Sequence, residues 1–145
     1  MVKIKFSSKK IGSGETFLVG MCPNKQRKSN STGFVWEGNR SGDVMSKIIE
    51  GFDNLFLTNV FNYYTDSVID KSIIDDGKAE LLEDIRSLNP KKIVCFGDFA
   101  FKEVNTLQLK NVKVVKVTHP SYILRFNIGV GEYIKSVRSE IGNSD

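Results

Sequence analysis

The sequence predicts an α/β fold, a three-layer α/β/α sandwich around a central, mostly parallel sheet of four strands. Short apolar runs rich in β-branched and aromatic residues recur at residues 17–21, 55–60, 93–96 and 112–117. Between these runs, apolar residues have helical spacing over residues 43–52, 78–88 and 99–107. Strands that alternate with helices imply right-handed crossovers and a parallel sheet that is covered on both faces.

Local signals mark the ends of the predicted helices. Asp98 is a natural N-cap for the third helix, and Asp75 or Asp76 for the second. Asn89 stands before Pro90, a position that disfavours helical backbone, so the second helix is expected to end there. A final helix is expected over residues 132–141, with Gly142 as its stop.

Length and composition indicate one soluble globular domain over residues 1–145. Hydrophobic residues make up 40% and charged residues 26%, values that argue against disorder, collagen-like repeats and coiled coils. No apolar run approaches the roughly 18 residues that span a bilayer. The first six residues are too poor in apolar side chains for a signal peptide. We therefore expect a cytoplasmic monomer that has no membrane partner.

The chain has two cysteines, Cys22 and Cys95, and one histidine. Each cysteine stands in or at the end of an apolar run, which is typical of a core thiol. These residues cannot supply the four ligands of a structural zinc site or an iron–sulfur cluster. The sequence therefore predicts no metal and no other cofactor.

The net charge of +4 is unevenly distributed along the chain. Within the first thirty residues, seven lysines and arginines face only Glu15, and a second basic cluster lies in the last quarter. A charge run is usually a solvated surface, and it also suits contact with nucleic acid. Both interpretations are open at this point.

In a parallel α/β sheet, ligands bind beyond the carboxyl ends of the strands. The segments that follow the predicted strands are therefore the candidates for chemistry: Gly20 to Pro23, Asn59 onward, Gly97 with Asp98, and His119 to Ser121. A loop rich in Ser, Asn and Gly over residues 25–42 is a further candidate, because loops of this length in compact domains usually have a function.

Four of these segments resemble motifs of the uracil-DNA glycosylase superfamily. Residues 19–23 resemble its first active-site motif, a Gly-x-x-Pro turn under the base, and residues 57–60 are similar to the strand that carries a base-reading asparagine in the fourth family. The Gly-Asn-Arg-Ser-Gly-Asp string at 38–43 resembles a loop of the fifth, broad-specificity family. Residues 118–125 resemble the His-Pro-Ser motif and the loop that fills the gap left in the duplex.

The resemblance covers about residues 17–140. It implies a glycosylase-like fold, DNA as the partner and a pocket for a flipped-out base. Its catalytic candidates are His119, which would donate to the departing base, Asn39, which would position water, and Asp43 as a second candidate for that task. Its substrate-binding candidates are Gly20, Met21 and Cys22 under the base, Phe34 stacked on it and Asn59 reading its Watson–Crick edge.

The resemblance also implies a DNA-binding surface. Arg40 and Ser41 belong to the long loop, and Tyr122, Ile123 and Leu124 would form an apolar wedge. Ser121 and Arg125 would contact phosphates. Simpler structural interpretations stay open: His119 as a turn cap, Asn59 in an Asx turn, and Phe34 as a core anchor.

The sequence departs from the family pattern at the residues that would handle water. Met21 and Cys22 stand where most families have a polar residue, Asn39 replaces an acid, and the iron–sulfur cysteines are absent. We therefore expect a DNA glycosylase that hydrolyses the N-glycosidic bond of uracil or another deaminated or modified base. The alternative is a catalytically weak or inactive protein that binds a base, a nucleotide or DNA. A dinucleotide-binding domain is disfavoured, because Gly12-Ser13-Gly14 lacks the third glycine and the following helix.

Overall fold

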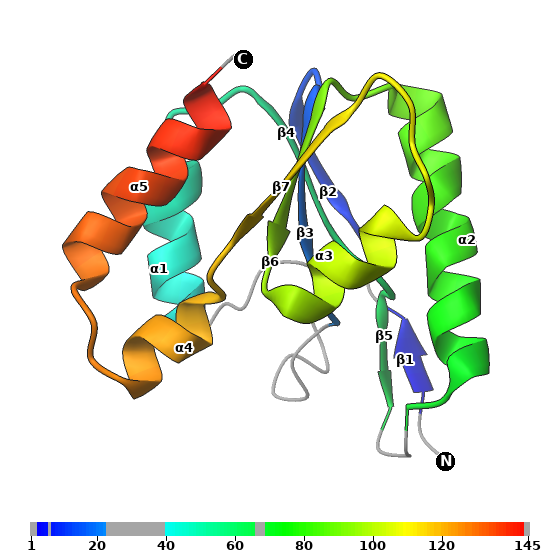
Figure 1. Ribbon diagram of the computed structural model, residues 1–145, viewed down its shortest axis with the longest axis horizontal. Coiled ribbons are helices and arrows are strands. Elements are labelled where there is room, and N and C mark those ends of the chain that lie inside the picture. The colour runs from blue at the N-terminus through cyan, green and yellow to red at the C-terminus, as the bar shows by residue number, and fades with distance from the viewer. Residues whose placement is uncertain (1–2, 6, 23–39, 66–68, 144–145) are drawn as a thin grey trace.

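A computed structural model describes residues 3–5, 7–22, 40–65 and 69–143. Its central sheet has five strands in the order β2-β4-β3-β6-β7 (Figure 1). Their bounds are β2 Lys9–Gly12, β3 Thr16–Gly20, β4 Asn54–Asn59, β6 Lys92–Phe96 and β7 Lys113–Val117. Four of them form the predicted parallel set, and β2 pairs antiparallel with β4. The sheet is therefore mixed and five-stranded, and the prediction of four strands was wrong by one.

Strand β2 escaped prediction because its sequence lacks an apolar run. It reads Lys-Lys-Ile-Gly and both lysines are exposed, as suits an edge strand that must discourage further pairing. Hydrogen bonds to β4, more than forty residues away, make it a strand. A small second sheet, also absent from the prediction, pairs β1 (Lys3–Lys5) antiparallel with β5 (Tyr63–Thr65).

Helices cover both faces of the central sheet, so the three-layer arrangement is confirmed (Figure 1). Alternate residues of each strand point to opposite faces. Leu18, Leu57 and Val94 pack beneath α1, α4 and α5, while Phe17, Phe56 and Ile93 pack beneath α2 and α3. Burial of each such side chain stabilises the fold by roughly 1.5–3 kcal/mol. The helices are α1 Arg40–Ile49, α2 Lys71–Leu88, α3 Asp98–Asn105, α4 Pro120–Arg125 and α5 Val130–Gly142.

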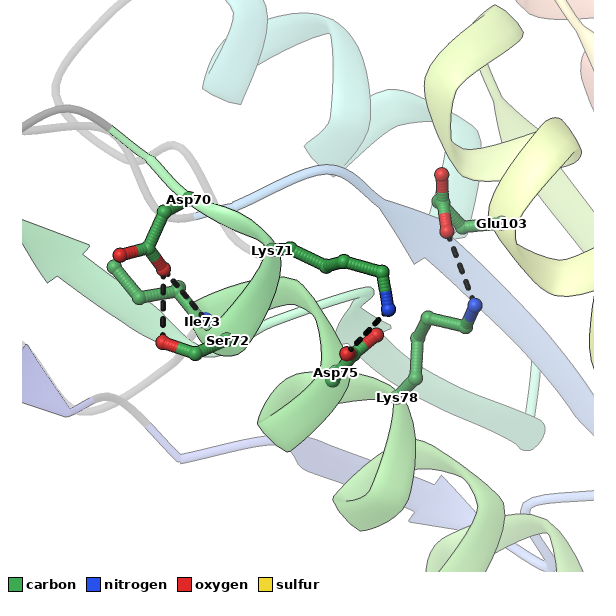
Figure 2. Close-up of polar contacts among 7 residues, drawn as sticks. All are labelled: Asp70, Lys71, Ser72, Ile73, Asp75, Lys78 and Glu103. Atoms are coloured by element: carbon green, nitrogen blue, oxygen red, sulfur yellow. Dashed lines mark hydrogen bonds and ion pairs between the residues drawn. The ribbon is translucent and has the colours of Figure 1, made fainter.

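Helix α2 begins seven residues before its predicted start. Its N-cap is Asp70, whose carboxylate accepts from the Ile73 backbone N–H (3.1 Å) and the Ser72 hydroxyl (2.9 Å) (Figure 2). Both bonds lower the pKa of Asp70 below its usual value, and the bond from the Ile73 N–H contributes most. Asp75 and Asp76 lie inside the helix, so their assignment as caps was wrong. The buried face begins at Ile73, which the shorter helix would have left out.

One salt bridge and one close approach join α2 to its neighbours in the fold. Lys78 bonds Glu103 of α3 at 3.1 Å, and Lys71 bonds Asp75 within α2 at 3.0 Å (Figure 2). A Cβ added to Gly77 would lie 2.3 Å from the Phe61 Cβ, a distance that side chains do not tolerate. Gly77 therefore lets α2 pack directly on the chain that leaves β4.

Other helix boundaries also differ from the prediction. Gly97 is the N-cap of α3 and Asp98 is its first residue, so Asp98 does not cap it. Helix α4 was not predicted, because six residues are too few for a helical period; its Pro120 suits the first turn of a helix, where the missing N–H costs nothing. Helix α5 starts two residues earlier than expected and includes Gly142. In the described part of the chain, no helix is both long and apolar enough to cross a membrane.

Candidate active site at the carboxyl edge of the sheet

The four parallel strands end at one edge of the sheet, which is also where α3 and α4 begin (Figure 1). Asn59 ends β4, and its register partner Gly20 ends β3. Gly97 follows β6, and its backbone N–H donates to the Val117 carbonyl of β7 at 2.9 Å. His119 stands two residues beyond the end of β7. The predicted meeting of these segments at one edge is therefore confirmed.

His119 is the N-cap of α4. Its Nδ1 accepts from the Ser121 backbone N–H at 3.1 Å and lies 2.8 Å from the Ser121 hydroxyl oxygen. A backbone N–H can only donate, so Nδ1 carries no proton, and the proton of the neutral ring is on Nε2. The simpler interpretation of this histidine as a turn cap is confirmed. Capping also selects the tautomer that makes Nε2 a hydrogen-bond donor.

The His119 ring is neutral at physiological pH. Desolvation by burial lowers the pKa of its imidazole from 6.5 to about 4. The cause is the loss of water around the ring, which disfavours the charged form. At pH 7 the residue is therefore a neutral donor rather than a cation.

A cleft of about 400 Å³ opens beside His119, within the usual range of ligand pockets. Gly97 forms one wall with a φ of 97°, and a Cβ there would lie 3.5 Å from the His119 Cβ. Lys116 bonds Asp98 at 2.9 Å in the same cleft. The residues that line this cleft are Gly97, Asp98, Lys116, Val117, Thr118, His119 and Tyr122.

Tyr133 of α5 holds the backbone just before His119 in place. Its hydroxyl donates to the Thr118 carbonyl, one residue before His119. Burial raises the pKa of Tyr133, so the hydroxyl keeps the proton that it donates. Sequence reasoning missed this residue, because nothing in the sequence of α5 distinguishes a tyrosine that meets a distant carbonyl from one that only fills the core.

Asn59 lies at the same edge but does not line the cleft beside His119. Two strands separate β4 from β7 in the sheet order, and at the usual spacing three such steps put them roughly 14 Å apart. The Asn59 side chain is buried, and its Nδ2 donates to the Asn62 Oδ1 at 3.2 Å. A common cavity for Asn59 and His119 therefore stays a prediction.

The end of β3 supplies backbone and apolar surface. Gly20 and Met21 accept through their carbonyls from the Val60 and Phe61 backbone N–H groups, at 2.8 and 3.2 Å. Met21 and Cys22 are half-buried against the cluster under α2 and α3. Burial raises the pKa of the Cys22 thiol to about 11, so it stays protonated. Neither side chain can activate water.

The predicted wedge is only partly exposed. Tyr122 is 51% exposed, whereas Ile123 is buried in the core and Leu124 is half-buried against it. Ile123 therefore cannot insert into DNA, because it anchors α4 to the sheet. Beyond the predicted segment, Phe126 and Ile128 are 56% and 46% exposed, and the Tyr122 and Phe126 rings pack with centroids 4.7 Å apart.

The remaining candidate residues lie on α4, in the first turn of α1, or outside the described residues. Ser121 and Arg125 are exposed on α4, which suits contact with phosphates. Asp43 is exposed in the first turn of α1, and Ser41 is half-buried there. Arg40 opens the same helix. Asn39 and Phe34 lie outside the described residues, and their roles stay predictions.

Cys95 is buried in the core, as predicted. Burial raises the pKa of its thiol to about 12, so it remains neutral. Among the residues with described structure, no three His, Cys, Asp or Glu side chains gather where they could hold a metal ion.

Comparison with known families adds a finding that is independent of this geometry. The family model described as Uracil DNA glycosylase superfamily matches residues 13–137. The matched segment contains β3, β4, β6 and β7 with the helices between them and most of α5. No curated protein matches the chain.

Proposed function

The chain belongs to the uracil-DNA glycosylase superfamily, and we propose that it hydrolyses the N-glycosidic bond of uracil or another deaminated or modified base in DNA. The observation that carries this proposal is the neutral, Nε2-protonated imidazole of His119 in the cleft beyond β6 and β7. The superfamily acts on DNA, so DNA is the partner.

The chemistry requires such a donor. Cleavage of a base from deoxyribose leaves positive charge on the sugar and negative charge on the departing base. A neutral imidazole that donates from Nε2 strengthens its hydrogen bond as negative charge builds on a base carbonyl. His119 fits this task because its capping bond to Ser121 fixes the ring before substrate arrives.

The surface around α4 supports contact with a nucleic acid strand. Tyr122 and Phe126 expose aromatic rings on which bases can stack. Arg125 is exposed on the same helix, and Tyr122 lines the cleft itself. We propose that a target base enters the cleft while its neighbours contact this aromatic surface.

A second candidate function is favoured by the end of β3. Met21 and the protonated Cys22 thiol offer no group that positions water. General-base help is worth roughly 10²- to 10⁴-fold in rate. Without the predicted contribution of Asn39, the same site would bind a base or DNA with little turnover.

The test uses labelled oligonucleotides that carry uracil, hypoxanthine, xanthine or hydroxymethyluracil, followed by alkaline cleavage of abasic sites. We expect strand breakage with at least one of them, and a loss of about 10²-fold or more in the His119→Ala variant. Lys91→Ala is the matched control, because Lys91 is exposed at the opposite edge of the sheet and pairs with Glu15.

Three outcomes separate the candidates. Breakage that His119→Ala abolishes and Lys91→Ala retains supports the glycosylase. Retention of the oligonucleotide without breakage supports the binding protein. Equal breakage by wild type and His119→Ala would remove His119 from the mechanism.

A further inference from the structure

The cleft beside His119 contains an ion pair that the proposed chemistry does not use. Asp98 is the first residue of α3, and Lys116 lies in β7 at the edge of the sheet (Figure 1). The Lys116 Nζ lies 2.9 Å from the Asp98 Oδ1. Among the described residues that line this cleft, Lys116 is the one lysine or arginine and Asp98 is the one carboxylate. An acid of the same chain therefore occupies the cation of this part of the cleft.

The Lys116–Asp98 pair contributes little to the stability of the fold. The side chain of Asp98 is 91% exposed and that of Lys116 is 47% exposed. Water screens the attraction between charges at such a surface, and holding two flexible side chains together costs conformational entropy. The pair between Lys78 and Glu103 differs, because both of its side chains are largely buried between α2 and α3. The exposed pair can therefore open at little cost to the fold.

A second contact holds Lys116 in the cleft and does not depend on Asp98. The Lys116 Nζ lies 5.7 Å from the centroid of the Phe101 ring, within the range of cation–π attraction. Phe101 belongs to α3 and packs against the core cluster under α2 and α3. The ring therefore keeps the ammonium in place when the Asp98 carboxylate moves away. The proton that was donated to Asp98 is then available to a ligand.

The position of the Asp98 carboxylate suits a phosphate. An ammonium group donates to any anionic oxygen, and a phosphate offers the same kind of acceptor as a carboxylate. Asp98 opens α3, where the positive end of the helix dipole favours negative charge of either kind. A nucleotide whose base enters the cleft has a phosphate on each side of its sugar, so a phosphate follows the base to the rim of the cleft. The exposed Asp98 side chain lies at such a rim.

We propose that Lys116 binds a backbone phosphate beside the target nucleotide, and that Asp98 is an internal competitor that occupies Lys116 until DNA displaces it. This inference rests on the proposed function, because it takes DNA as the ligand of the cleft. When the phosphate binds, the Asp98 carboxylate turns into the solvent that already surrounds most of it. A base in a strand gains this phosphate contact and a released base does not. The pair therefore favours bases in DNA over free bases.

Equilibrium binding of the full chain to a labelled oligonucleotide with one tetrahydrofuran abasic site tests the contact. This analogue keeps both flanking phosphates and has no base to cleave. We expect Lys116→Gln to weaken binding about three- to tenfold and to reduce the slope of log affinity against log salt by about one.

Two further oligonucleotides identify the phosphate. Each replaces the phosphate on one side of the abasic site with a neutral methylphosphonate. The wild type should bind one of these two more weakly than the fully charged oligonucleotide. Lys116→Gln should bind that oligonucleotide and the charged one equally, because the contact is already lost.

Asp98→Asn tests the competitor. The change removes the charge and keeps the size of the side chain, so a larger fraction of the Lys116 ammonium is available to phosphate. We expect binding to strengthen about threefold. The same change in the Lys116→Gln background should have a smaller effect, because no ammonium is left to release.

The Lys91–Glu15 pair is the matched control. Its atoms lie 3.1 Å apart, both side chains are exposed, and it lies at the opposite edge of the sheet. Lys91→Gln and Glu15→Gln change the net charge as Lys116→Gln and Asp98→Asn do, so they measure the general effect of charge. Both should keep nearly wild-type affinity. Thermal unfolding is measured for every variant, and we expect unchanged melting temperatures because both pairs are exposed.

The outcomes separate this inference from the proposed function. If Lys116→Gln loses no more affinity than Lys91→Gln, or loses it together with its fold, the phosphate contact is overturned. Equal gains from Asp98→Asn in both backgrounds would mean simple repulsion of DNA and would overturn the competitor. Failure of the wild type to cleave any deaminated base refutes the glycosylase alone, because these binding measurements need no turnover. If the wild type binds no oligonucleotide, both fail.

Discussion

The two edges of the central sheet hold clefts of similar size and different chemistry. The cleft at the carboxyl edge measures about 400 Å³ and contains His119. The cleft at the amino edge measures about 460 Å³ and lies among the starts of β3, β4, β6 and β7 and the end of α5. There the buried Lys92 donates to the carbonyls of Glu140 (2.6 Å) and Asn143, and Lys91 bonds Glu15 at 3.1 Å.

The comparison shows that volume alone does not distinguish the cleft proposed as the active site from the other one. The ammonium of Lys92 satisfies carbonyls at the end of α5 and offsets the negative end of the helix dipole, which is a task of the fold. His119 also serves the fold through Nδ1, and this bond places the proton of the neutral ring on Nε2. The two clefts therefore differ in their polar groups: a lysine that bonds helix carbonyls at the amino edge, and a histidine that carries its ring proton on Nε2 at the carboxyl edge.

The largest expected effect is at the wall of the carboxyl-edge cleft. Gly97→Val forces a β-branched residue into a φ of 97°, at a strain of roughly 1–3 kcal/mol. Its side chain also presses on His119, so we expect cleavage to fall about 10²-fold. Cleavage rate and thermal unfolding are the measurements.

Gly131→Ala is the matched control for that change. An added Cβ at Gly131 of α5 meets nothing within 4 Å, so cleavage should be unchanged. Wild-type cleavage by Gly97→Val would show that the position of His119 does not depend on this wall.

At the opposite edge, we expect a loss of stability alone. Lys92→Met keeps the apolar stem of the side chain and removes the donor to Glu140 and Asn143, so the free energy of unfolding should fall by about 2 kcal/mol. Denaturant unfolding measures this change. Cleavage per folded molecule should equal that of wild type, and a specific loss of activity would mean that the amino-edge cleft takes part in function.

The aromatic surface of α4 should contribute a smaller amount to binding. Phe126→Ala is expected to weaken oligonucleotide binding by roughly 1 kcal/mol through lost stacking, with an unchanged dependence on salt.

Arg125→Ala should instead reduce the slope of log affinity against log salt by about one. Titrations at several salt concentrations measure both, and an unchanged affinity in both variants would place the DNA elsewhere.

A further expected effect, seen only below pH 6.5, is the dependence of stability on pH. The unfolded imidazole of His119 has a pKa of 6.5 and the folded one a pKa of about 4, so the unfolded chain binds the proton first as pH falls. Stability associated with the neutral ring is therefore complete above pH 6.5 and is lost as pH falls toward 4. His119→Asn should flatten this part of the curve of melting temperature against pH. An identical acid-side slope in both proteins would mean that the pKa of His119 is not lowered.

Local pattern was sufficient to predict the parallel core and the edge of the sheet that holds the candidate site. The runs at 17–21, 55–60 and 93–96 contain buried strands, because their β-branched and aromatic side chains have both faces of the sheet to fill. The run at 112–117 contains the edge strand β7, whose valines are half-buried and whose lysines are exposed. Parallel strands then require that the segments after them meet at one edge. This is why the His-Pro-Ser segment could be placed at the same edge of the sheet as Gly97 without coordinates.

Strand β2 and helix α4 could not be found in the same way. Lys9–Gly12 has one apolar residue and becomes a strand only by pairing with β4. Pro120–Arg125 is helical because Ile123 is buried against the sheet and the His119 ring caps its first turn. The pairing of β2 with β4 and the burial of Ile123 depend on partners distant in sequence, and local propensity is blind to such partners.

By itself, the sequence determined which residue types stand at the strand ends: a glycine, an asparagine and the lone histidine, in an order that resembles one superfamily. Only the tertiary structure decided which proton His119 carries and which way the Asn59 amide faces. Both are set by hydrogen-bond partners and by the exclusion of water, and these come from residues that folding alone brings together.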